Sequence, residues 1–228
     1  MDLLNILYLV ILTLALFSAC LIGGKKYRGT VLYALAIGGA VNANFFHAGN
    51  YPIKIYGLDF GIDFVLYNIF IFCVIVMLLE NGKKDAYLLG TSSIIAIMLS
   101  AVFQFIAELF SKGYSVTIWE NLINFAFSSL ASIIVLVIIV ELISFFLRRN
   151  IIKNKYVLVL IGMGIATILN SPIYYALSGL VLGHAENVGY LLLSSFIGKL
   201  LTIGVAVLTL FLLEIIDKKR QEKLNKEA

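Results

Sequence analysis

The chain consists of long, almost uninterrupted blocks of apolar residues separated by short charged stretches. A helix that crosses a lipid bilayer needs about 20 mostly apolar residues. Blocks of that length are not typical of the short strands and amphipathic helices of soluble domains. The sequence therefore predicts an all-α, polytopic transmembrane bundle of about seven spans, at Leu3–Gly23, Thr30–His47, Phe60–Glu80, Ala86–Phe110, Thr117–Leu147, Tyr156–Leu182 and Tyr190–Ile216.

Composition agrees with this prediction. Hydrophobic residues make up 61% of the 228 residues and charged residues only 13%, whereas soluble domains are about 25% charged. So few charges do not cover the surface of a soluble protein of this size. We expect one integral membrane domain over residues 1–217, a charged tail over residues 218–228, and a multi-pass location in the cell (plasma or inner) membrane.

Positive charge is concentrated in alternate loops. Fourteen of the 17 lysines and arginines fall within residues 25–28, 83–84, 148–155 and 218–226, whereas Lys54, Lys112 and Lys199 lie elsewhere. Because cytoplasmic loops are enriched in Lys and Arg, we predict that the N-terminus lies outside and the C-terminus in the cytoplasm. The same distribution attributes the net charge of +4 to membrane orientation, and we expect no nucleic-acid partner.

Motifs for catalysis and metal binding are missing from the sequence. It has no H-E-x-x-H, no P-loop and no G-x-S-x-G, the motifs of zinc proteases, phosphate-binding NTPases and α/β-hydrolases. The only histidines are His47 and His184, and the two cysteines, Cys20 and Cys73, lie within apolar blocks. We therefore expect no metal site, no cofactor and no catalytic residue, and a protein that is not an enzyme.

Polar side chains gather in the outer half of several predicted spans. Such groups cost free energy in hydrocarbon, so they tend to face a cavity or a partner. Lys199 lies near the middle of the last span, too deep for its amine to reach either surface easily. The shared depth predicts a polar pocket open to the outside. In this pocket the side-chain amides would hydrogen-bond the donors and acceptors of a solute, Tyr174 would stack on it, and Lys199 would bind one of its electronegative atoms. The residues expected to bind solute are Asn44, His47, Gln104, Glu108, Asn124, Asn170, Tyr174 and Lys199.

Short motifs, in order along the chain, resemble those of the vitamin uptake transporter family, also called queuosine precursor transporters. Ala43-Asn44 is similar to the family's Ala-Asn at the end of an early span, and residues 82–86 are similar to its glycine-containing basic turn. Leu130-Ala131-Ser132 resembles its Leu-Ala-Ser helix. Asn170-Ser171 falls where the family has Asp-Thr, and Lys199 falls on its late in-membrane lysine. The chain departs from the family at its acidic pair, where Ile75 and Leu79 stand.

The resemblance implies a six-helix core like the substrate-binding components of energy-coupling-factor transporters, plus one helix. It implies import of a small polar solute, a queuosine precursor of the 7-deazaguanine type or a vitamin-like molecule. The partners so implied are that solute, the lipid bilayer and, in one variant, a separate energy-coupling ATPase module.

Two other classes of function stay open from the residues alone. A structural or sensory membrane subunit would use the polar groups only for hydrogen bonds between helices, and Lys199 would then belong to a structural ion pair. A membrane-embedded enzyme acting on a lipid or prenyl group would need polar residues near the cytoplasmic face. The carboxylates available there are Glu80, Asp85, Glu141, Glu214 and Asp217.

Overall fold

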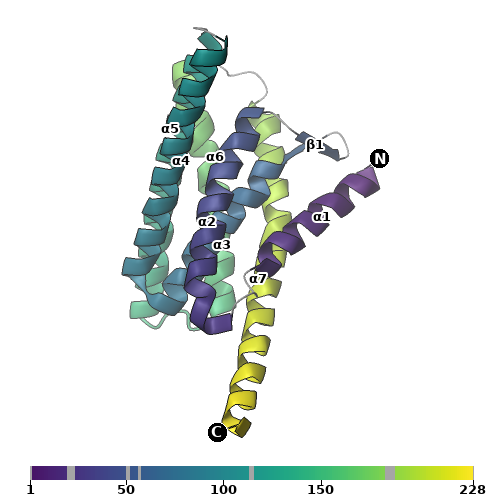
Figure 1. Ribbon diagram of the computed structural model, residues 1–228, viewed down its shortest axis with the longest axis vertical. Coiled ribbons are helices and arrows are strands. Elements are labelled where there is room, and N and C mark those ends of the chain that lie inside the picture. The colour runs from purple at the N-terminus through teal and green to yellow at the C-terminus, as the bar shows by residue number, and fades with distance from the viewer. Residues whose placement is uncertain are drawn as a thin grey trace.

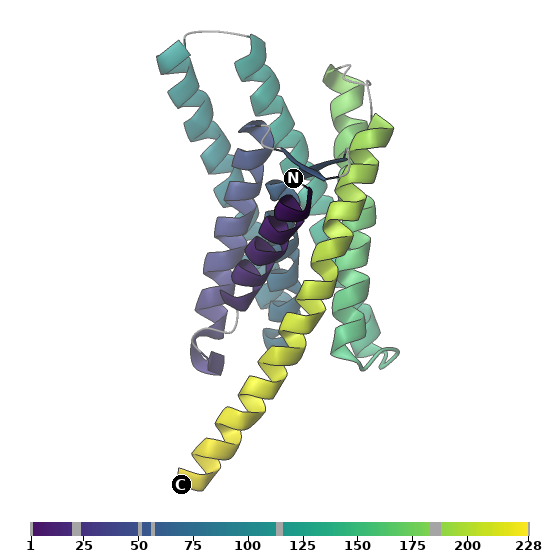
Figure 2. The same ribbon diagram turned by 90° about the vertical axis from the view of Figure 1, so that its right-hand side faces the viewer.

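The computed structural model of the chain describes residues 2–19, 24–49, 52–55, 58–112, 116–182 and 188–227. Within these ranges the chain forms a helical bundle with one short hairpin (Figure 1). Helices α2 to α7 run alternately up and down the bundle, and the last part of α7 extends beyond it (Figures 1 and 2). The elements are α1 (Asp2–Ser18), α2 (Gly24–Gly49), β1 (Pro52–Ile55), β2 (Leu58–Gly61), α3 (Ile62–Asn81), α4 (Lys83–Lys112), α5 (Val116–Arg148), α6 (Lys155–Leu182) and α7 (Val188–Glu227).

Each predicted segment overlaps one of these helices, so the predicted all-helical class is confirmed. Five of them, α3 to α7, are long and apolar enough to cross a membrane. Helix α1 has 17 residues and lies obliquely against the bundle (Figure 1), packed on α7 and α3. The charged tail predicted over residues 218–228 continues α7 as a helix to Glu227.

The antiparallel hairpin of β1 and β2 was not predicted. Each strand has four residues, and Pro52 pairs with Gly61 at its open end. A strand pair this short has no apolar block, which is the feature on which the sequence prediction depended. The hairpin contacts α1 and α7, and it takes up the first two residues of the predicted segment Phe60–Glu80, so α3 begins at Ile62.

Helix α3 forms the centre of the bundle. Its residues from Val65 to Leu78 are buried, apart from the half-buried Tyr67. A helix that is apolar on every side is typical of a fully buried position, and α3 packs against α2, α4, α6 and α7. The apolar side chains of α4 instead remain exposed, for example Phe103 and Phe110, as expected of a surface that faces lipid.

Small residues bring the helices close together. A Cβ atom on Gly39 would lie 2.9 Å from the backbone oxygen of Leu66, so a side chain on α2 would force it away from α3. Gly90 on α4 faces Leu136 of α5 in the same way, at 2.6 Å from its side chain. These contacts fit the use of glycine for tight helix packing in membrane proteins.

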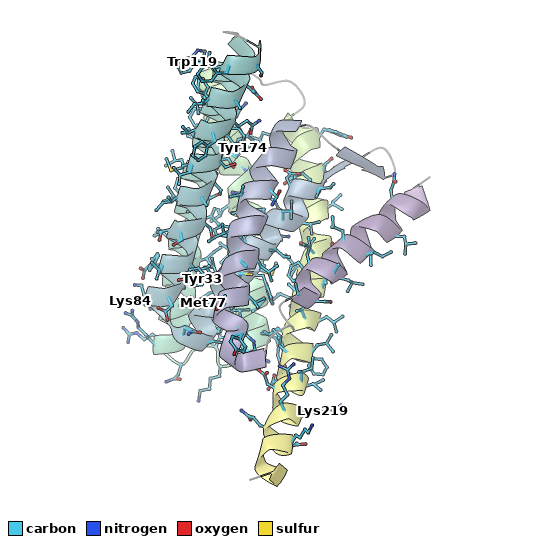
Figure 3. The ribbon with its side chains drawn as sticks, viewed as in Figure 1. Tyr33, Met77, Lys84, Trp119, Tyr174 and Lys219 are labelled. Carbon is cyan, nitrogen blue, oxygen red and sulfur yellow. The ribbon has the colours of Figure 1, made fainter. Side chains whose placement is uncertain are left out.

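The two ends of the bundle differ in charge. We call the end that holds the start of α2, the turn at Gly82 and the α5–α6 connection the basic end, and the opposite end the hairpin end. Lys84 and Lys219 lie at or beyond the basic end, whereas Trp119 lies at the other (Figure 3). The alternation of basic loops in the sequence therefore corresponds to two physical ends of the structure.

Ion pairs join the helices at the basic end. Arg28 of α2 is 4% exposed, and its guanidinium donates to Glu80 of α3 and to Asp217 of α7, each at 2.7 Å. Lys83 pairs with Glu141 at 2.7 Å, which connects α4 to α5. Lys155 pairs with Glu214 at 2.9 Å, connecting α6 to α7. Four of the five carboxylates considered above for an enzyme site are thus partners in ion pairs between helices.

Candidate functional site

A cavity of about 60 Å³ lies inside the bundle, and every helix from α2 to α7 contributes to its wall. It occupies the half toward the hairpin end: Tyr174, in its wall, lies away from Lys84 and Lys219 (Figure 3). Apolar residues of α2, α3 and α4 complete the wall. Its residues with polar groups are Asp63, Tyr67, Ser128, Ser132, Asn170, Ser171, Tyr174, Tyr175, Ser195 and Lys199.

Lys199 is the centre of the polar contacts. Its residue is 3% exposed, and its Nζ donates to Ser171 Oγ at 2.7 Å and to Asn170 Oδ1 at 3.2 Å. The hydroxyl of Ser171 also hydrogen-bonds that of Ser195, with 2.6 Å between the oxygens. The amine is therefore held between α6 and α7 by uncharged oxygen atoms.

Aromatic rings and one carboxylate complete the surroundings of the amine. Nζ lies 5.0 Å from the centre of the Tyr67 ring and 5.8 Å from that of Phe64, within the range of cation–π attraction. Asp63, one residue before Phe64, lines the same cavity and interacts electrostatically with Lys199. The start of α3 thus provides both the rings and the negative charge that stabilise a buried ammonium group.

Side-chain hydrogen bonds fix the backbone of α7 next to this lysine. Asn68 of α3 is fully buried and donates from Nδ2 to the backbone oxygen of Lys199 at 3.0 Å and to the hydroxyl of Thr202. Thr202 donates to the same backbone oxygen at 2.8 Å. An amide buried in hydrocarbon needs such partners. The pairing holds α7 in register with α3, so the position of the amine is set by both helices.

The structure brings three of the eight predicted site residues to the cavity, namely Asn170, Tyr174 and Lys199. Asn124 lies beside it, and its Oδ1 accepts a hydrogen bond from the Tyr174 hydroxyl at 3.4 Å.

The other predicted residues lie elsewhere or are not described. Gln104 and Glu108 are half-buried on α4, hydrogen-bond each other at 3.2 Å and do not line the cavity. Asn44 and His47 belong to the end of α2, but their side chains lie outside the described residues.

Sequence reasoning did not select several residues of this site. Asp63 and Tyr67 lie in the polar outer half of the third predicted span, and this depth indicated that they could belong to the pocket. The hydroxyls of Ser171 and Ser195 give little indication of a site, because serine is common in transmembrane helices. Ser195 does stand four residues before Lys199, and therefore one turn away on the same face. That spacing was the available clue to its place beside the amine.

The site combines a cation, an anion, hydroxyl groups and aromatic rings in a small space. A volume of about 60 Å³ holds a few water molecules, whereas pockets for drug-sized ligands measure about 300–1,000 Å³. An organic solute therefore needs the side chains in the wall to move. Within the described ranges, no three His, Cys, Asp or Glu residues cluster in a way that could hold a metal ion.

Comparison of the chain with protein-family models, with curated proteins and with solved structures found no match. Its function is therefore inferred from the chain's own sequence and geometry.

Proposed function

We propose that the chain is a multispan membrane transporter, or a substrate-binding membrane component, that imports a small polar solute. The observation that carries this proposal is the buried amine of Lys199 at the wall of a polar cavity shared by six helices. Ionisable groups at this depth are costly and mark solute or ion pathways more often than simple packing. Asn170, Ser171 and Ser195 provide hydrogen bonds that a solute replaces or shares, and Tyr67 and Tyr174 provide rings for a planar solute.

The asymmetry of the bundle supports a transport role. The cavity lies toward the hairpin end, while the basic end is joined by the ion pairs of Arg28, Lys83 and Lys155. The cavity thus lies toward one end of the bundle, and ion pairs hold the helices together at the other end. This arrangement is expected of a carrier that accepts solute from one side of the membrane. Release on the opposite side then requires the basic end to open.

The orientation belongs to the same proposal. We infer seven spans, with α1 and α2 added to the five long apolar helices, and the basic end in the cytoplasm. In a variant without native cysteines, Ser111→Cys at the hairpin end is expected to react with an impermeant maleimide in intact cells. Lys84→Cys should react only after permeabilisation, and the reverse pattern would contradict the orientation. Both positions are exposed on α4.

Two variants of the proposal differ in their source of energy. In one, the chain is a self-sufficient carrier; in the other, it binds solute and docks on a separate ATPase module, as the family resemblance implies. Co-purification of the full chain with an ATPase distinguishes the second variant from the first.

The proposal is tested by screening the purified protein against queuosine precursors, nucleobases and vitamins, with thermal unfolding as the first readout. A ligand present at 100 times its Kd stabilises the native state by about 2.7 kcal/mol, so a true solute should raise the unfolding temperature measurably. Compounds that do so are then tested for uptake into vesicles that contain the protein. A panel that neither stabilises the protein nor enters the vesicles would favour a structural or sensory subunit.

A further inference from the structure

A second polar site lies at the basic end, outside the cavity described above. The last turns of α5 form an open recess of about 340 Å³, lined by Glu141, Ser144, Phe145, Arg148 and Arg149. Ser144 and Phe145 lie three and four residues after Glu141, and Arg148 and Arg149 each lie four residues after one of them, so the five residues share one flank of the helix. The recess therefore combines two cations and a hydroxyl at the point where α5 reaches the membrane surface.

The recess has an excess of positive charge. Arg148 and Arg149 are exposed and have no ion-pair partner among the described residues. Glu141, the acid in the recess, is already neutralised by Lys83 at 2.7 Å and accepts a hydrogen bond from the Tyr87 hydroxyl at 2.8 Å. An anion in the recess thus meets two guanidinium groups without an ion pair, of which Arg148 also interacts electrostatically with Glu141.

Ser144 points to a ligand independently of this charge. It is 6% exposed, and its Oγ is buried without a hydrogen-bond partner among the described residues. A buried polar group without a partner is costly, and serine within a helix can usually bond a backbone oxygen of the preceding turn. Ser144 lines the recess, and rotation of its side chain would bring the hydroxyl to an oxygen of a bound anion.

The surface that leads away from the recess is apolar. Leu130, Ile134, Val137 and Ile138 are exposed on α5 at the same three- and four-residue spacing that leads to Glu141 and Phe145. From Leu130 to Arg148 the helix rises about 27 Å, which exceeds half the thickness of a hydrocarbon core of about 30 Å. An acyl chain can therefore lie along α5 while its headgroup occupies the recess.

We propose that this recess binds the phosphate headgroup of an anionic phospholipid, with an acyl chain along the exposed apolar face of α5. Arg148 and Arg149 hold the phosphate, and Ser144 donates to one of its oxygens. Basic residues at the cytoplasmic side of transmembrane helices are typical sites for such headgroups, and the proposed orientation places the basic end on that side. The site shares no residue with the cavity around Lys199, so it stands whether or not the chain transports a solute.

The test compares phosphatidylglycerol with phosphatidylcholine of the same acyl chains, each added to the purified full chain in detergent and measured by native mass spectrometry. Wild-type protein is expected to retain phosphatidylglycerol preferentially. Arg148→Gln/Arg149→Gln should weaken that binding roughly 30-fold, at about 1 kcal/mol for each charge. Ser144→Ala should weaken it about tenfold, as expected for a lost hydrogen bond to a charged group.

A matched variant controls for overall charge. Lys219→Gln/Arg220→Gln removes two adjacent, exposed charges from α7 and should leave binding unchanged. An equal loss in both double variants, or equal retention of the two lipids by wild type, would overturn the proposal. Inorganic phosphate at millimolar concentration is a further arm: full displacement of the lipid by phosphate would assign the recess to a soluble anion instead.

Discussion

Replacing Lys199 by methionine is expected to lower solute binding and uptake by roughly 10- to 100-fold, the range for a lost hydrogen bond from a charged donor. Methionine is similar in length and fills the same space, so the change removes the ammonium group and little else. The amine lies at the wall of the cavity, 2.7 Å from Ser171 and 3.2 Å from Asn170. A solute that enters the cavity therefore meets it directly.

The stability of this variant separates a ligand-binding role from a structural one. A buried cation has lost most of its hydration, and Ser171 keeps its hydrogen bond to Ser195 when the amine is gone. The Asp63 carboxylate that loses this positive charge is only half-buried, so water partly compensates it and we expect the unfolding temperature to fall only slightly. A large loss of stability together with unchanged binding would instead indicate a structural ion pair. Thermal unfolding and uptake measured on the same preparation give both quantities.

Two further variants complete this experiment. Lys84→Met makes the same substitution at an exposed position at the basic end and should leave solute binding unchanged. Asp63→Asn/Lys199→Met removes both charges of the cavity, so it tests the loss of the amine in a background without a change in net charge. Wild-type uptake by a folded double variant would exclude a role for the amine.

The sequence predicted the helices well because a span leaves a local signal. A run of about 20 apolar residues is visible without knowledge of any other part of the chain, and each predicted run overlaps a helix, from Asp2–Ser18 to Val188–Glu227. The strand pair Pro52–Ile55 and Leu58–Gly61 has no such signal, because its eight residues are held by cross-strand hydrogen bonds and by contacts with α1 and α7.

The candidate site was only partly predictable for a related reason. Depth along a helix can be estimated by counting residues, and depth alone selected Lys199 and Asn170. Which neighbours meet at that depth depends on how distant helices are arranged, and the sequence does not state this. Gln104 and Glu108 show the difference: four residues apart on α4, they hydrogen-bond each other, an outcome that local spacing allows without any cavity.

Arg28→Gln is expected to lower the free energy of unfolding by about 2 to 3 kcal/mol. Removing one partner of a fully buried ion pair costs about 3–5 kcal/mol, because the remaining charge stays buried without compensation. The side chains of Glu80 and Asp217 are 32% and 21% exposed, so water partly compensates them and the cost falls below that range. Unfolding in detergent, followed by heat or by denaturant, measures the difference.

The matched control for this change is Lys83→Gln, which breaks the pair with Glu141 between side chains that are 34% and 51% exposed. Exposed pairs contribute little to stability, so the control should unfold close to wild type, and an equal loss in both variants would contradict a special role for Arg28.

Removing the two carboxylates as well tests why Arg28→Gln lowers the stability. If the loss arises from the two carboxylates left behind, then Arg28→Gln/Glu80→Gln/Asp217→Asn should recover much of the stability, because the triple variant leaves no uncompensated charge between α2, α3 and α7. If the triple variant is instead less stable than Arg28→Gln, the carboxylates stabilise the basic end through other contacts, and Arg28 is not the residue that holds the three helices together.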